Sequence, residues 1–152
     1  MTIQDKAEMV MAAAKVSEMD PAEAWSVLES EPDAMLVDVR TRPEWAFVGT
    51  PDLTGIGKQV ILTEWRQFPG MNVNQAFVPA LLDQVGTPPK KIFFLCRSGA
   101  RSMEAAMQTA AELGETTECI NVREGFEGDL DQQGHRAHLN GWKARGLAWR
   151  QS

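Results

Sequence analysis

The sequence predicts an α/β fold in which helices flank a central, mostly parallel sheet. Short apolar runs suited to buried strands occur at 34–39, 59–62, 91–95 and 118–122. Segments rich in helix formers precede the first of them at 21–29 and separate later ones at 74–85 and 102–113. Strands that alternate with helices are typical of a parallel sheet covered on both faces. We therefore expect a three-layer sandwich.

Size and charge narrow the class of protein further. A chain of 152 residues is expected to form one domain with a sizeable core. Its net charge of −6 argues against a general nucleic-acid or membrane-surface binder, because both need a basic face. No apolar run has the length of a membrane-spanning helix, and the first residues do not resemble a signal peptide. A cytoplasmic protein is expected, in which both cysteines stay reduced.

The N-terminal part divides into two segments. Residues 1–16 form an expected helical extension, because apolar residues recur at helical spacing from Ile3 to Lys15. The main domain is expected over 17–152, and Asp20 followed by Pro21 marks the start of its first helix. Pro43 to Phe47 is expected to form a short helical turn whose Trp45 and Phe47 cover the core.

The later elements follow from the same kinds of signal. Asn74 is expected to cap a helix that runs to Val85, and Gly114 to stop the helix over 102–113. Trp142 and Trp149 are expected to dock the C-terminal tail on the body of the domain.

The stretch from Lys91 to Ser102 carries the strongest chemical signal. An apolar strand ends at Cys96, and small and cationic residues lead directly into a helix. Such a loop turns successive backbone N–H groups inward and, with the helix dipole, favours an anion and the thiolate form of a cysteine. Gly99 allows the tight turn. The predicted site therefore consists of a nucleophilic Cys96 and the anion-binding residues Arg97, Ser98, Gly99, Ala100, Arg101 and Ser102.

Residues at two other strand ends are candidates for the surroundings of this site. Asp38 and Arg40 end the strand over 34–39, and ligands bind beyond the carboxyl ends of parallel strands. We expect Asp38 to brace the loop or an arginine, with an ordinary surface ion pair as the alternative. Trp65 and Arg66 lie in an irregular segment with exposed aromatic residues, and are candidate substrate contacts. Core packing of Trp65 and a solvated Arg66 are their alternatives.

The loop from Cys96 to Ser102 resembles the active-site loop of rhodanese-type sulfurtransferases, C-R-S-G-x-R-S. Residues 36–45 resemble the family's early strand and its R-x-x-x-E-[YFW] stretch, and residues 121–126 its last strand and glycine-bearing segment. The chain departs from the family where Thr50 and Pro51 follow Gly49, where Glu124 replaces the first glycine of the usual pair, and in a polar insertion over 127–139.

The resemblance implies a rhodanese-like three-layer sandwich and a sulfurtransferase. Cys96 would take sulfur from a small anion such as thiosulfate, become a persulfide, and pass the sulfur to cyanide or a thiol. A persulfide carrier or partner-binding module, served by a protein donor or acceptor, is the alternative. A cysteine phosphatase or arsenate reductase is disfavoured, because four residues rather than five separate Cys96 from Arg101.

No cofactor or metal is expected. The insertion contains a run from Asp129 that resembles the start of a calcium loop, but Asn140 stands where the bidentate glutamate is needed. His135 and His138 have no adjacent cysteine or further histidine to complete a zinc site. Cys119 has no cationic loop behind it and is expected to be structural, with a resolving thiol as the alternative.

Overall fold

The computed structural model describes residues 15–152. The helix predicted over Ile3 to Lys15 therefore lies, apart from its last residue, outside the described residues. Within residues 15–152, no helix combines the length and the apolar character needed to cross a bilayer.

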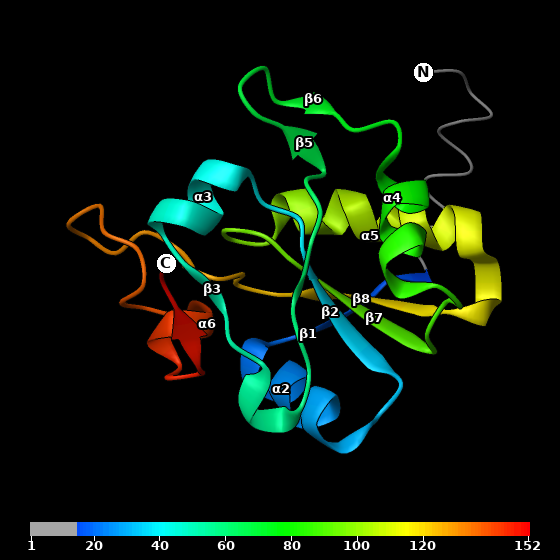
Figure 1. Cartoon of the computed structure of the whole chain (residues 1–152). Coiled ribbons are helices and arrows are strands. Elements are labelled where there is room, and N and C mark those ends of the chain that lie inside the picture. Colours follow the sequence, from blue (N-terminus) through cyan, green and yellow to red (C-terminus); the bar gives the residue numbers. More distant parts are fainter. Residues whose placement is uncertain (1–14) are drawn as a thin grey trace.

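The centre of the molecule is a five-stranded sheet in the order β1-β8-β7-β2-β4 (Figure 1). Every neighbouring pair is parallel. Leu95 at the end of the middle strand β7 pairs with Asp38 at the end of its neighbour β2. Both strands therefore end at the same edge of the sheet. The predicted parallel sheet is confirmed. The strands are β1 (Ser17–Met19), β2 (Ala34–Asp38), β4 (Ile61–Leu62), β7 (Lys91–Leu95) and β8 (Glu118–Val122).

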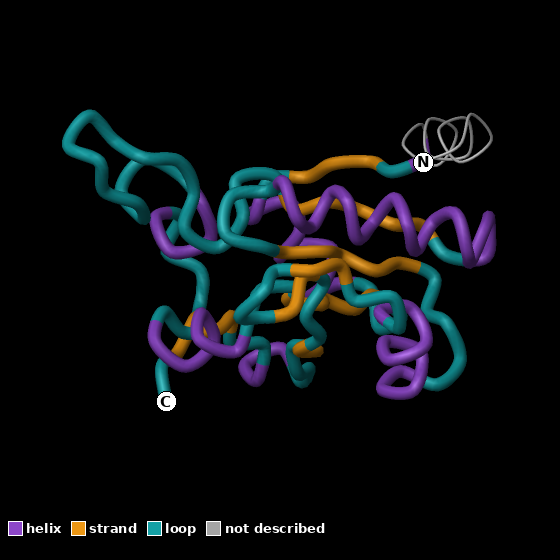
Figure 2. Tube along the Cα trace, turned by 90° about the horizontal axis from the view of Figure 1, so that it is seen from above, coloured by secondary structure: helices purple, strands orange, loops and turns teal. Residues whose placement is uncertain are grey.

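Helices cover both faces of this sheet, which makes the three-layer sandwich. Alternate residues of each strand point to opposite sides. Val37 and Phe94 pack with residues of α4 (Phe77–Val85) and α5 (Ala100–Leu113). Leu36 and Phe93 pack on the other side, with α2 (Pro21–Ser30) and α6 (Gly141–Ala144). Figure 2 shows α5, the longest helix of the described chain, running along the strands.

The predicted helix ends are partly confirmed. Asp20 Oδ1 accepts a hydrogen bond from the Glu23 N–H at 2.9 Å and caps α2, and Gly114 ends α5 with a φ of 63°. The predicted start of α4 at Asn74 is wrong, because the helix begins at Phe77. Asn74 instead accepts from the Ala76 N–H and donates to a backbone oxygen of the preceding loop, so it closes a turn ahead of the helix.

The other differences between the predicted and the observed elements concern short strands and helices. The strand predicted over 59–62 pairs only at Ile61 and Leu62, and the three-residue β1 gave no usable pattern. Phe47 does not cover the core: it ends α3 and is 80% exposed, while Trp45 is partly buried. The remaining elements are α3 (Arg42–Phe47), β3 (Thr50–Pro51), β5 (Arg66–Gln67), β6 (Asn72–Val73), β9 (Trp149–Arg150), η1 (Thr54–Ile56) and η2 (Gly114–Thr116).

The C-terminal part forms a protruding loop and a docked tail. The insertion over 127–139 extends away from the body (orange in Figure 1). After it the chain returns through Trp142, which is fully buried and packs edge-on against Trp25 with ring centroids 5.8 Å apart. Trp149 packs on Phe126, while 39% of its own surface stays exposed. The predicted docking of the tail is confirmed.

Candidate active site

Cys96 follows the last residue of the central strand β7 and opens the loop to α5. Gly99 precedes the helix with a φ of 114°, in the region that favours glycine, and its backbone N–H donates to Cys96 Sγ at 3.1 Å. Ser102, in the first turn of α5, donates from its hydroxyl to the same sulfur, also at 3.1 Å. The loop thus directs two hydrogen-bond donors at one sulfur atom, which itself belongs to a residue only 1% exposed.

A buried amide on the next strand braces these donors. Asn121 Oδ1 lies 2.6 Å from Ser102 Oγ, and Asn121 Nδ2 donates to the Gly99 carbonyl at 3.2 Å and to Glu18 Oε2 at 3.0 Å. A serine hydroxyl carries one hydrogen, so Asn121 Oδ1 at 2.6 Å, Cys96 Sγ at 3.1 Å and the Gly99 carbonyl at 3.2 Å compete for it. A thiolate is a stronger hydrogen-bond acceptor than a thiol, so the thiolate form of Cys96 attracts the Ser102 hydrogen more strongly. Sequence analysis missed this role of Asn121, although a polar residue within an apolar strand was the available signal.

The segment after β8 supports the loop from behind. The Phe126 N–H donates to the Cys96 carbonyl at 2.8 Å, and the Glu127 N–H donates to the Arg97 carbonyl at 3.0 Å. A Cβ added to Gly125 would lie 2.5 Å from the Arg97 carbonyl carbon and oxygen. Only glycine permits so close an approach of the two backbones at this point.

Arg101 forms a two-pronged ion pair with Glu44 of α3. Its Nη1 and Nη2 atoms donate to the two carboxylate oxygens at 2.7 and 2.9 Å. Thr41 adds backbone and hydroxyl hydrogen bonds to the same carboxylate. Burial alone would raise the pKa of Glu44, but the hydrogen bonds and charge of Arg101, with Thr41, outweigh it and lower the pKa to about 2. Hydrogen bonding to Glu44 raises the pKa of Arg101 in turn.

Asp38 and Arg40 form a fully buried pair, so the surface ion pair considered for them is wrong. Arg40 Nε and Nη2 donate to the Asp38 carboxylate, with the shortest contact at 2.7 Å, and both side chains are 0% exposed. Arg40 also donates to the Gly49 carbonyl and stacks 4.3 Å above the ring of Phe126. Asp38 therefore braces an arginine, as expected, at the strand end beside Cys96.

The other predicted residues separate into two groups. Arg97 and Ala100 are exposed, and Ser98 is partly buried, so the loop presents these three to solvent. Trp65 is buried in the core, with 6% exposure and an edge-on contact to Phe77, which agrees with the core-packing alternative. Its indole N–H donates to Glu104 Oε1 at 2.9 Å.

Arg66 is half-buried and pairs with the same carboxylate as Trp65. Its Nη2 lies 3.1 Å from Glu104 Oε1. The two residues therefore fasten the segment before β6 to α5. Contact of Arg66 with a substrate stays a prediction.

The site therefore consists of a buried cysteine, Cys96, at the junction of a parallel strand and a helix, with an N–H and a hydroxyl donor at its sulfur. A family model for the rhodanese-like domain matches residues 20–131. The chain therefore belongs to the rhodanese-like family.

Individual relatives agree with this assignment. An uncharacterized protein of Rickettsia conorii is 39% identical over 127 residues, which are 83% of this chain and 90% of that protein. The crystal structure of Rv0390 from M. tuberculosis superposes with a TM-score of 0.80 at 44% identity, covering 90% of this chain and 98% of that one. A homodimeric polysulfide-sulfur transferase from Wolinella succinogenes shares the fold, with a TM-score of 0.57, 22% identity and coverage of 98% and 88%.

Proposed function

We propose that the protein transfers a sulfane sulfur atom by way of a persulfide on Cys96. The observation that carries this proposal is the pair of donors, the Gly99 N–H and the Ser102 hydroxyl, each 3.1 Å from Cys96 Sγ. Hydrogen bonds to a charged acceptor are stronger than those to a neutral one, so this arrangement stabilises a thiolate more than a thiol. The thiolate form of a cysteine attacks without a neighbouring base.

The reaction has two half-steps. The Cys96 thiolate attacks the outer sulfur of thiosulfate; a new S–S bond forms at Sγ, and the S–S bond of the donor breaks as sulfite leaves with the electron pair. The terminal sulfur of the persulfide then lies beside the same loop donors. A cyanide ion or thiolate attacks that sulfur, forms a bond to it, and returns the electron pair to Cys96 as thiolate.

The charges around the loop suit a small anionic donor. Arg97 is exposed and free to meet the sulfonate group, while the charge of Arg101 is balanced by Glu44, which holds it in place. Cys96 is 1% exposed, which favours a donor whose reacting sulfur is small and terminal. Family membership supports the same chemistry, and the Wolinella protein of similar fold is itself named a polysulfide-sulfur transferase.

A steady-state assay with thiosulfate and cyanide tests the proposal through thiocyanate formation. Cys96→Ser should abolish turnover, while the matched variant Cys119→Ser should retain it, because Cys119 lies inside strand β8, paired with Ile92 of β7, and not in the loop before α5. Turnover that survives in Cys96→Ser would contradict the proposal. Hydrolysis of an aryl phosphate without sulfur transfer would favour the phosphatase alternative, and persulfide formation from a protein donor without turnover would favour a carrier.

A further inference from the structure

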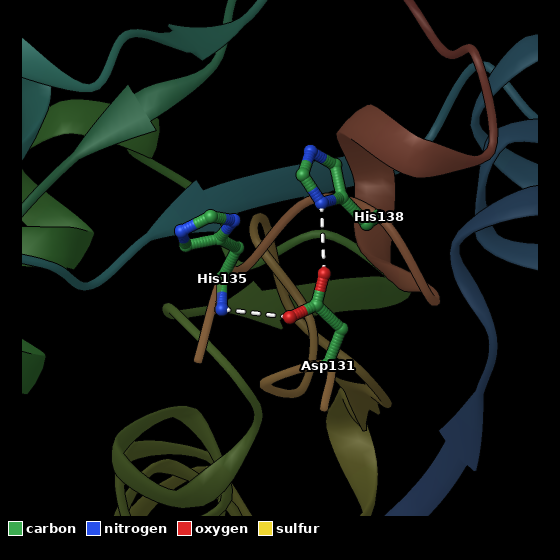
Figure 3. A group of neighbouring side chains, drawn as sticks. All are labelled: Asp131, His135 and His138. Atoms are coloured by element: carbon green, nitrogen blue, oxygen red, sulfur yellow. Dashed lines mark hydrogen bonds and ion pairs between the residues drawn. The ribbon is translucent and has the colours of Figure 1, made fainter. Parts of the chain in front are cut away.

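The insertion over 127–139 brings together three side chains with metal-binding atoms. The two histidines of the chain, His135 and His138, both lie here, and Asp131 joins them (Figure 3). Their candidate ligand atoms all lie within 4.8 Å of one another. We propose that Asp131, His135 and His138 form a binding site for Zn²⁺.

The first part of the site is built by a closed turn. The Asp131 N–H donates to the His135 carbonyl at 2.8 Å, and the Gly134 N–H donates to the Asp131 carbonyl at 3.0 Å. Asp131 Oδ1 accepts from the backbone N–H groups of Gln133 and His135, each at 2.9 Å. These bonds hold the carboxylate and His135 at the two ends of one turn without help from an ion.

The second oxygen of Asp131 faces the other histidine. Asp131 Oδ2 lies 2.9 Å from His138 Nδ1. Ligand atoms bound tetrahedrally to Zn²⁺ at about 2.0–2.2 Å are separated from one another by roughly 3.3–3.6 Å, so this hydrogen-bonded pair needs to open only slightly for an ion to replace the shared proton.

Contacts to the base of the insertion hold the limb that carries His138. The Ala137 N–H donates to the Glu127 carbonyl at 2.7 Å, and Arg136 Nη1 donates to the Gly128 carbonyl at 2.6 Å. Gly128 in turn donates to the Arg97 carbonyl behind the Cys96 loop, at 3.2 Å. Hydrogen bonds thus hold the backbone of the turn from Asp131 to His135 and of the segment that carries His138. Rotation of the two histidine rings is therefore the main adjustment that an ion requires.

The types of ligand favour Zn²⁺ over the common hard cations. Two imidazole nitrogens and one carboxylate oxygen suit Zn²⁺ and its neighbours in the transition series, whereas Ca²⁺ and Mg²⁺ prefer oxygen ligands throughout. Three protein ligands leave a fourth position for water. The sequence indicated no site because the histidines lacked a third ligand beside them; the closed turn supplies Asp131.

Metal titration of the full-length protein tests the proposal independently of sulfur transfer. The background is the variant with both Cys96→Ser and Cys119→Ser, so that no thiolate competes for the ion. Isothermal calorimetry with Zn²⁺ should give one ion per chain. Titration with Co²⁺ should give visible absorption of a nitrogen- and oxygen-bound ion. The imidazole resonances of the two histidines should both shift when Zn²⁺ is added.

Single substitutions distinguish a site from scattered surface binding. His135→Gln, His138→Gln and Asp131→Asn should each weaken Zn²⁺ binding by at least about tenfold. Asp131→Asn is informative because an amide oxygen can still accept the two backbone hydrogen bonds that close the turn. The matched control is Asp129→Asn, which removes an acidic group of the same insertion and should leave affinity unchanged.

Two results would overturn the proposal. One is the absence of Zn²⁺ binding to the thiol-free background at micromolar concentrations. The other is unchanged affinity after His135→Gln and His138→Gln are combined, which would place the ion elsewhere. Circular dichroism of each variant checks that loss of binding is not loss of fold.

Discussion

Arg101 and Glu44 join the first turn of α5 to α3 through two short hydrogen bonds, of 2.7 and 2.9 Å. The side chains are 17% and 21% exposed, so this pair is better shielded from water than an ordinary surface ion pair. The sequence suggested that Arg101 grips the substrate anion. In the structure both of its terminal nitrogens hold Glu44, so its first role is to fix the loop that carries Cys96.

Replacing Glu44 with Gln should destabilise the protein in a pH-dependent way. The pKa of Glu44 is about 2 in the fold against an ordinary 4.5, so the ion pair stabilises fully above about pH 4.5 and loses its effect as pH falls towards 2. At pH 7 the free energy of unfolding should fall by about 1–3 kcal/mol. Urea unfolding of both proteins between pH 7 and pH 2.5 measures the difference.

The gap between the Glu44 variant and the wild type should narrow below about pH 4.5. A gap that stays constant down to pH 2.5 would show that the carboxylate charge is not what stabilises the fold. Glu112→Gln serves as the control, because Glu112 is an exposed residue of the same helix α5 and its replacement should change little.

Replacing Ser102 with Ala should slow the reactions of Cys96 as a nucleophile. It removes one of the two donors at Sγ and leaves the Gly99 N–H. A hydrogen bond to a charged group contributes about 1.5–3 kcal/mol, and the Ser102 hydrogen is shared with Asn121, so alkylation of Cys96 by iodoacetamide at pH 7 should slow by up to about tenfold. Ser98→Ala, in the same loop and only partly buried, should leave the rate nearly unchanged. Equal alkylation rates in the two variants would show that the Ser102 hydroxyl does not raise the reactivity of Cys96.

Replacing Gly125 with Ala should disturb the loop from behind. The added Cβ would lie 2.5 Å from the Arg97 carbonyl, and the residue has a φ of 69°. Gly57 has a similar φ of 74°, but a Cβ there meets no atom of the described chain within 4 Å. Gly57→Ala should therefore show backbone strain alone, about 1–2 kcal/mol, while Gly125→Ala should lose more stability and most sulfur transfer. Thermal unfolding and thiocyanate formation measure both effects. If the two variants lost equal stability and equal activity, the close approach of Gly125 to the Arg97 backbone would be contradicted.

Cys119 should be chemically inert in the folded protein. Burial raises the pKa of its thiol to about 12, and Glu118 adds to that rise. At pH 8 its thiolate fraction is therefore very small. Peptide mapping after brief exposure to iodoacetamide should find label at Cys96 and none at Cys119, and both should react in denaturant. Labelling of Cys119 in the folded state would revive its role as a resolving thiol.

The strongly patterned parts of the chain were predictable because local signals and tertiary packing agree there. The strand before Cys96 is apolar, and helix-forming residues follow the loop, so the order strand, loop, helix could be expected. Asp20 and Pro21 marked a helix start in the same way. The two-residue strands carry too few residues to form a pattern, and neither they nor β1 could be bounded from the sequence.

The partners of the site residues were not predictable because they come from distant positions. Asn121 reaches Ser102 across the sheet, and Arg101 pairs with a glutamate 57 residues away. The prediction that Trp65 is exposed was wrong, because a loop residue after a short strand gives no local sign of burial. The sequence indicated Cys96 as the candidate nucleophile, and the structure shows which residues surround and position it.

The most direct measurement is the intact mass of the reduced protein before and after thiosulfate, with sulfite determined in the same tube. The proposal predicts a gain of one sulfur atom that maps to Cys96, an equal amount of sulfite, and removal of that sulfur by cyanide. A chain that gains no sulfur, although Cys96 is shown to be free and open to alkylation, would contradict transfer from thiosulfate. If polysulfide and protein persulfide donors then also left Cys96 unchanged, the central claim would fall.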